Sequence, residues 1–298
     1  MSEAALANKS EHAMAAPFGA LTPGGFERAI IAVTANLPNN WFGLRVAIGL
    51  RRLVMSSHED DFGLDVERWG LHLRLHPRRN GCEKNLLFTP QMYEVPERVE
   101  LASEIDEGKA AGRPFCFVDI GANVGLFSFF VASRAGPHAK IIAIEPEPTN
   151  LSRMRFNLAA NPQIPIQVLG LALGENAGRL SLEVDCRDRG GTRTAPLNEH
   201  NQATAVECRP LLEVVTRQQL QYIDALKIDV EGAEDKILVP FFLAAPDALW
   251  PNLIIIEDTR DLWRTDLNSF LADRGYRVST RSKLNLMLRR TIAVQHVR

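Results

Sequence analysis

The sequence predicts an α/β protein in which a mostly parallel sheet is covered by helices on both faces. From residue 115 onward, short apolar runs of strand length alternate with longer amphipathic segments of helical length. Strands that alternate with helices form parallel sheets, because each helix carries the chain back across a face of the sheet. The first of these strands also leads into a glycine-containing turn, as in nucleotide-binding βα units. Ligands of such sheets bind at the carboxyl ends of the strands.

The N-terminal segment, residues 1–60, is expected to be a helical extension ahead of a catalytic domain formed by residues 61–298. Apolar residues recur at helical spacing from residue 26 to 37 and again from Trp41 to Met55. The second segment is basic and contains two glycines that suit close helix contact. We therefore favour docking on the catalytic domain or a homodimer for these helices over peripheral contact with an anionic membrane.

Residues 64–75 alternate apolar and polar side chains around Trp69-Gly70, which predicts a β-hairpin. His72, Arg74 and His76 share the polar face of its second strand. Histidines two positions apart on a strand are sometimes metal ligands. A solvated face is the expectation here.

The stretch Phe115–Ser128 reads FCFVDIGANVGLFS and has the pattern of a strand, a tight turn and a helix. The apolar run ends at Asp119, and Gly121, Asn123 and Gly125 follow at two-residue spacing. Gly121 is expected to permit a sharp turn close to a ligand, and Asn123 to tolerate a positive φ. Gly125 is expected to let the next helix pack closely on the sheet.

The acid before this turn indicates which nucleotide is bound. Asp119 would repel the pyrophosphate that dinucleotide sites hold on a G-x-G-x-x-G turn. It would attract an ammonium group, such as that of S-adenosylmethionine (SAM). A second apolar strand, residues 141–144, ends at Glu145, where a carboxylate suits the hydroxyls of a ribose. The candidate cofactor-binding residues are therefore Asp119, Gly121, Asn123, Gly125 and Glu145. The alternative is a turn whose glycines have only a structural role.

The rest of the chain supplies the remaining elements. Thr216 and Gln219 fit a capping box and predict the start of a short helix. A polar loop is expected over residues 187–201. Further helices are expected over residues 96–108 and 148–160, and strands over residues 164–169, 180–184, 205–209, 225–229, 253–257, 276–280 and 286–290.

Four segments in this order resemble the FkbM family of SAM-dependent methyltransferases: FVDIGANVGLFS, AIEPEPTNLSRMRFNLAAN, ALKIDVEGAEDKIL and LIIIEDT. The resemblance covers residues 61 to the C-terminus. It implies the Rossmann-like class I methyltransferase fold with seven strands, SAM as donor, and methylation of a hydroxyl on a sugar or small metabolite. The alternatives are an inactive SAM-fold binding or scaffold protein and a nicotinamide-dependent oxidoreductase. The intact acids count against an inactive scaffold protein. Asp119 and the absence of a G-x-G-x-x-G motif count against an oxidoreductase.

Further acids follow the fourth and fifth core strands. Asp229 should lie near the transferring methyl, and Asp229 or Glu231 is the candidate base for a hydroxyl acceptor. Lys227 is expected to be structural. Asp229, Glu257 and Asp258 resemble the acids with which catechol-type O-methyltransferases hold Mg²⁺. The FkbM resemblance does not itself imply a metal, so metal-free base catalysis is favoured and no metal ligand is assigned.

Composition narrows the class of protein. The chain has 298 residues and a net charge of −2, which argues against a nucleic-acid partner. Its four cysteines lack C-x-x-C spacing, so neither a disulfide framework nor a zinc site is expected. No signal peptide or membrane span is apparent, and a cytoplasmic location is expected.

Overall fold

The computed structural model describes residues 16–58, 62–184, 191–196 and 204–291. The chain forms two compact units. The first comprises residues 1–95, 149–163 and 185–191, and the second comprises residues 96–148, 164–184 and 192–298. The division into an extension and a catalytic domain at residue 60 stays a prediction.

The second unit is built on a seven-stranded sheet in the order β12-β13-β11-β10-β3-β4-β5. Strand β13 is antiparallel to both of its neighbours, and the other neighbouring pairs are parallel. The strand order reverses between β3 and β10, so the switch point lies there. The expected mostly parallel sheet is thereby confirmed. Its strands are β3 (Cys116–Ile120), β4 (Lys140–Ile144), β5 (Ile166–Leu169), β10 (Ala225–Ile228), β11 (Leu253–Glu257), β12 (Tyr276–Arg281) and β13 (Asn285–Arg290).

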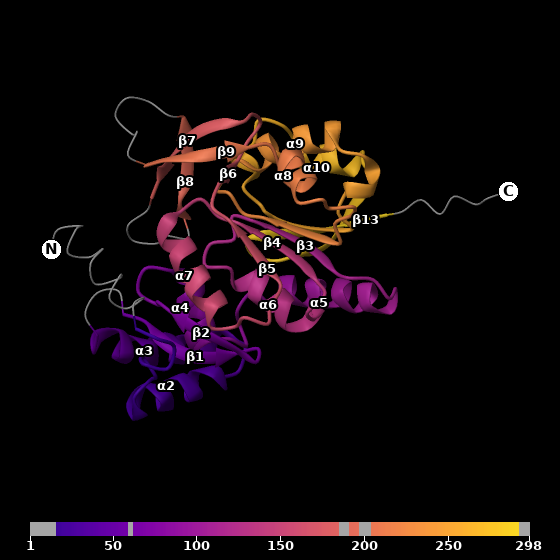
Figure 1. Cartoon of the computed structure of the whole chain (residues 1–298). Coiled ribbons are helices and arrows are strands. Elements are labelled where there is room, and N and C mark those ends of the chain that lie inside the picture. The colour runs from indigo at the N-terminus through magenta and orange to yellow at the C-terminus, as the bar shows by residue number, and fades with distance from the viewer. Residues whose placement is uncertain (1–15, 59–61, 185–190, 197–203, 292–298) are drawn as a thin grey trace. The chain divides into compact units, whose positions relative to one another are not determined.

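Helices cover both faces of this sheet (Figure 1). Helices α8 (Leu211–Arg217), α9 (Glu234–Ala244) and α10 (Leu267–Ala272) lie on one face, and α5 (Val95–Ala110) and α6 (Leu126–Ala135) lie on the other. Alternate strand residues, such as Val118 and Ile120, pack into one apolar cluster with α8, α9 and α10. The intervening residues face α5 and α6, because successive strand side chains point to opposite faces.

A four-stranded sheet in the order β6-β9-β7-β8 completes the second unit. Its strands are β6 (Ala172–Leu173), β7 (Gly178–Glu183), β8 (Arg193–Pro196) and β9 (Ala205–Arg209). Strand β8 lies within the expected polar loop, and residues 187–190 and 197–201 of that loop lie outside the described residues. The capping box at Thr216 is wrong. Helix α8 begins after Pro210 and ends at Arg217, because Leu211, Val214 and Val215 supply its buried face.

The first unit contains α2 (Gly25–Ala35), α3 (Trp41–Ser56), the hairpin β1 (Leu64–Arg68) and β2 (Leu71–Leu75), α4 (Gly81–Phe88) and nearly all of α7 (Pro148–Ala159). The hairpin is confirmed. Trp69 and Gly70 both have positive φ, 56° and 73°, as a two-residue type I′ turn requires. Helix α4 was not expected from the sequence. None of the described helices is both long and apolar enough to cross a membrane.

The polar face of β2 is buried, so the expectation of a solvated face is wrong for Arg74 and His76, although His72 is exposed. Arg74 donates to both carboxylate oxygens of Asp65, at 2.6 and 2.9 Å. Asn157 of α7 accepts from the Arg74 backbone N–H at 2.7 Å and so covers this face. Burial, and next the positive charges of Arg153 and Arg74, hold the pKa of His76 well below its ordinary value, so the imidazole is neutral.

Candidate active site

The glycine turn after β3 adopts the left-handed backbone that its sequence predicts. Gly121, Asn123 and Gly125 have φ values of 69°, 55° and 80°. A Cβ atom on Gly121 would lie 1.9 Å from the carbonyl oxygen of Asp229. Gly121 is therefore required by the close approach of the segment after β10. Gly125 is the N-cap residue of α6, and its left-handed conformation explains the glycine there.

Glu145 fixes this turn to the end of β4. Its Oε2 accepts from the backbone N–H of Asn123 at 2.8 Å, and its Oε1 accepts from that of Glu147 at 2.9 Å. The N–H groups of Gly121 and Ala122 both donate to the Ile144 carbonyl at 3.0 Å. Glu145 thus has an organising role that the sequence did not suggest. A carboxylate offers about four acceptor positions, so this role is compatible with binding a ribose hydroxyl.

Asp119 lies within β3 and is only 1% exposed. Its Oδ2 accepts from the Ser128 hydroxyl at 2.7 Å. Its Oδ1 is buried and has no hydrogen-bond partner among the described residues. Burial raises the pKa of Asp119, while Lys227 and Ser128 oppose the shift. A donor group on a bound cofactor would satisfy this acceptor, and the turn residues therefore fit SAM.

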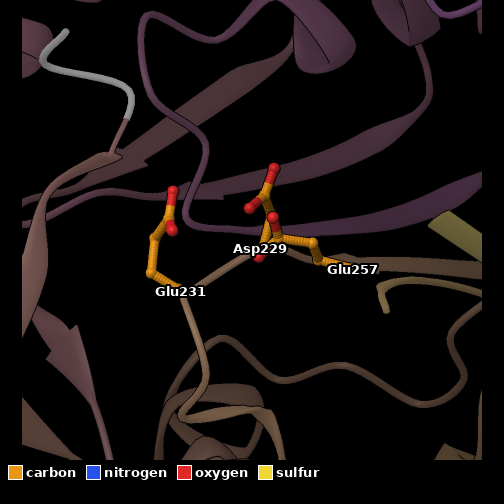
Figure 2. Close-up of side chains that lie close together, drawn as sticks. All are labelled: Asp229, Glu231 and Glu257. Atoms are coloured by element: carbon orange, nitrogen blue, oxygen red, sulfur yellow. The ribbon is translucent and has the colours of Figure 1, made fainter. Parts of the chain in front are cut away.

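Three carboxylates meet at the carboxyl ends of β10 and β11 (Figure 2). We call Asp229, Glu231 and Glu257 the acidic cluster; one oxygen from each lies within 4.8 Å of the others. Strands β10 and β11 are parallel neighbours with Ile228 opposite Ile256, so the residues that follow them emerge together. Glu231 has a φ of 57°, which places it in a tight turn after β10. The structure thus brings together both predicted catalytic residues, with Glu257 beside them.

The electrostatics of the acidic cluster favour a bound proton. Burial, and next the negative charges of Asp229 and Glu231, raise the pKa of Glu257 to about 8. Its Oε2 is buried and has no hydrogen-bond partner among the described residues. Burial and Asp229 also raise the pKa of Glu231, which Arg193 at 3.7 Å partly offsets. Near neutral pH, Glu257 therefore carries its proton in most molecules.

Two residues supply the frame of the acidic cluster. Lys227, expected to be structural, is buried and donates to Asp229 at 3.0 Å. Glu234, at the first position of α9, is fully buried and accepts four hydrogen bonds. Its Oε1 binds the N–H groups of Val230 and Gly232, and its Oε2 binds Thr259 and the Trp263 indole. An acid at a helix start was the available sequence signal for Glu234.

Asp258 does not join the acidic cluster, although it follows Glu257 directly. It forms a bidentate ion pair with Arg260 at 2.8 and 2.6 Å and a second pair with Arg281 at 3.2 Å. The Arg260 hydrogen bonds hold its pKa below the ordinary value. The catechol-type arrangement that includes Asp258 is therefore not formed. The acidic cluster itself has the hard oxygen ligands that Mg²⁺ accepts, but Lys227 already supplies a positive charge beside Asp229.

Residues 119–278 match the family model described as the methyltransferase FkbM domain. The chain belongs to the FkbM methyltransferase family. This FkbM protein is 32% identical to methyltransferase sdnD of Sordaria araneosa in an alignment 207 residues long, and the match covers 58% of this chain and 78% of sdnD. It is 30% identical to the AMB antimetabolite synthetase AmbE of Pseudomonas aeruginosa in an alignment 203 residues long, and that match covers 55% of this chain and 10% of AmbE.

The FkbM protein also matches the solved structure of precorrin-6y C5,15-methyltransferase from Geobacter metallireducens. The match has 15% identity and a TM-score of 0.37, and it covers 69% of this chain and 89% of that chain. The fold assignment rests on the strand order of the FkbM protein itself.

Proposed function

We propose that this FkbM protein transfers the methyl group of SAM to a hydroxyl oxygen of a sugar or small metabolite. The carrying observation is the acidic cluster, which lies at the switch point and contains a carboxyl with a pKa of about 8. SAM supplies an activated methyl group on a sulfonium. A hydroxyl acceptor must lose a proton as it is methylated, and a carboxylate held beside it can accept that proton.

The turn residues are assigned to the cofactor. Asp119 receives the amino group of SAM, because its unsatisfied Oδ1 needs a donor. Glu145 receives the ribose and also holds the turn through its hydrogen bond to Asn123. The left-handed residues Gly121 and Gly125 shape the loop between them.

The acidic cluster is assigned to the acceptor. The acceptor oxygen forms its bond to the methyl carbon as the carbon–sulfur bond breaks, and its proton passes to a carboxylate. Asp229 and Glu231 are the proposed bases, and Glu257, which holds a proton near neutral pH, lies beside them. Lys227 holds the carboxylate of Asp229 in place through its 3.0 Å contact. Products are the methyl ether, S-adenosylhomocysteine and a protonated carboxyl.

A small acceptor is supported by two observations. One relative is named an antimetabolite synthetase, which is a name for an enzyme of small-molecule synthesis. In addition, the acidic cluster would repel the phosphates of a nucleic acid. A neutral hydroxyl compound would not be repelled in this way.

The test is incubation of the full chain with isotopically labelled SAM and a panel of sugars and metabolites, followed by mass spectrometry. We expect a labelled methyl group on oxygen. D229N and E231Q should each lower turnover by roughly a hundredfold while S-adenosylhomocysteine binding stays unchanged. E207Q, at an exposed acid of β9, is the control. Methylation on nitrogen or carbon would contradict the proposal.

We propose further that the reaction needs no metal, because Lys227 neutralises Asp229 directly. Turnover of the identified acceptor should be unchanged by EDTA. Loss of turnover in EDTA and its return with Mg²⁺ would instead assign the acidic cluster to a cation.

A further inference from the structure

The first unit exposes apolar side chains on both of its two N-terminal helices. The described residues leave eleven large hydrophobic side chains exposed, and six of them lie on α2 and α3, including Trp41 at 71% and Phe42 at 64%. We call these six the α2–α3 surface: Phe26, Val33, Trp41, Phe42, Leu44 and Leu53. Exposed apolar side chains gathered on neighbouring helices mark an interaction site.

Helices α2 and α3 expose the side chains of the α2–α3 surface although each helix also buries apolar side chains. Helix α2 buries Ile30 and Ile31, and α3 buries Ala47 and Val54. Phe26 and Val33 are seven residues apart and lie in one row along α2 with the buried Ile30 between them, so this row is exposed at both ends. The exposed side chains are therefore not part of the core of this unit.

The connection between the helices holds this surface in shape. Asn40 caps α3 by accepting from the Gly43 N–H at 2.9 Å. A Cβ atom on Gly43 would lie 2.1 Å from the Pro38 carbonyl oxygen, so the turn is closely packed. Gln91 donates to the carbonyls of Thr34 and Leu37 at 2.9 and 3.0 Å. Binding to a partner would not require these helices to fold first.

The charge of this segment identifies the partner. Residues 25–56 contain four arginines and one glutamate, a net charge of +3, in a chain whose net charge is −2. Arg45 and Arg52 are exposed beside the apolar side chains. Arg45 lies 5.2 Å from the centre of the Trp41 ring, and within the described part of the chain neither arginine forms an ion pair. A surface that combines exposed Trp and Phe with arginine suits anionic headgroups above an apolar layer.

A second copy of the chain fits this surface less well. A symmetric dimer through this surface would bring Arg45 and Arg52 of both copies into one interface. Residues 25–56 contain only Glu27 to offset them, and Glu27 is already bound to His58 and the Gly24 N–H. Helix α3 has 16 residues and is about 24 Å long. It is too short to cross a hydrocarbon core of about 30 Å, so it would lie in the plane of the interface.

We propose that the α2–α3 surface binds the protein to the surface of an anionic lipid bilayer. The aromatic side chains enter the headgroup region, and the arginines bind lipid phosphates. The preference for a homodimer or for docking on the catalytic domain, drawn from the sequence, stays a prediction; the exposure of these side chains and the positive charge beside them favour the lipid surface.

The experiment is flotation of the full-length protein with vesicles of phosphatidylcholine alone or of phosphatidylcholine mixed with phosphatidylglycerol. We expect binding to the mixed vesicles, weakened by salt. R45Q and R52Q should each weaken that binding about fivefold, and W41A/F42A at least about tenfold. The matched controls are R217Q and V99A/L243A, which change exposed side chains elsewhere.

Unchanged melting temperatures for W41A/F42A would show that loss of binding is not loss of fold. Failure of the wild-type chain to float with mixed vesicles would overturn the proposal. So would equal binding by W41A/F42A and V99A/L243A. A concentration-dependent dimer in sedimentation, abolished by W41A/F42A, would assign the surface to a second copy instead.

Discussion

Asp119 and Glu257 both have raised pKa values, but different neighbours act on them. Burial is the main cause of the raised pKa of Asp119, and Asp229 adds to it, whereas Lys227 and Ser128 oppose the shift. The pKa of Glu257 is raised by burial and also by the negative charges of three nearby acids. A cationic ligand group would stabilise the charged form of Asp119. Glu257 gains or loses its proton according to the charge of the acids around it.

At Asp119, replacement by Asn keeps the shape of the side chain and removes its charge. D119N should weaken SAM binding about tenfold or more, since a charge-assisted hydrogen bond contributes about 1.5–3 kcal/mol. Isothermal titration calorimetry would measure the affinity, with D261N at an exposed acid as the control. Unchanged affinity would remove Asp119 from the cofactor site.

At Glu257, stability should depend on pH. Its pKa is about 8 in the folded protein against an ordinary value of 4.5, so between these values the folded state holds a proton that the unfolded state releases. This contribution to stability is complete below about pH 4.5 and is lost as the pH rises to about 8. E257Q has no such proton to lose. Above pH 8 it should melt about 2 °C or more higher than wild type relative to their difference at low pH.

Melting temperatures of wild type, E257Q and the exposed control E207Q across this pH range would measure the effect. Parallel curves for wild type and E257Q would show that Glu257 titrates normally.

At the scale of elements, the site is held by the loops that follow β10 and β11. Both are organised by one buried residue, Glu234, which begins α9. Its two oxygens bind the β10 loop on one side and Thr259 with Trp263 on the other. The position of Asp229 and Glu231 relative to Glu257 therefore depends on a side chain outside the acidic cluster.

E234Q should both destabilise the protein and slow its reaction. The amide nitrogen of Gln cannot accept, so either the N–H groups of Val230 and Gly232 or the Trp263 indole lose their hydrogen bond to residue 234, at a cost of about 1–3 kcal/mol. Chemical denaturation would measure the stability. The kcat for the identified acceptor should fall more than the affinity for S-adenosylhomocysteine. Equal stability of E234Q and the exposed variant D247N would contradict this role.

At the scale of the whole molecule, the proposed site residues are confined to one of the two units. Every residue assigned to SAM or to the acceptor belongs to the second unit. The first unit has its own buried ionic network, in which Arg74 donates to the carbonyls of Ala16 and Pro17 at 2.8 Å. Asp65 accepts from the N–H groups of Gly19 and Leu21 at 2.7 and 3.0 Å.

Deletion of residues 1–57 should therefore leave SAM binding intact but lower the melting temperature, because it removes these partners of Arg74 and Asp65. Deletion of residues 1–15 retains all of them and is the control. Calorimetry and thermal melting would measure both quantities. A truncated protein that folds but does not bind SAM would show that residues 1–57 complete the cofactor site.

The sequence by itself determined the sheet, the glycine turn and the acids at the strand ends. These follow from local pattern: apolar runs of strand length, left-handed residues at fixed spacing, and an acid at the end of each run. Parallel strands place their carboxyl ends at one edge, so these acids were expected at that edge, and the observed pairing of β10 with β11 makes Asp229 and Glu257 neighbours.

Only the tertiary structure decided what each polar group contacts. It buried Arg74 and His76 in the first unit, turned Asp258 toward two arginines, and brought the Asp229 carbonyl against Gly121. It also raised the pKa of Glu257 to about 8. The physical reason is that burial and charge depend on side chains distant in the sequence, which a local pattern does not specify.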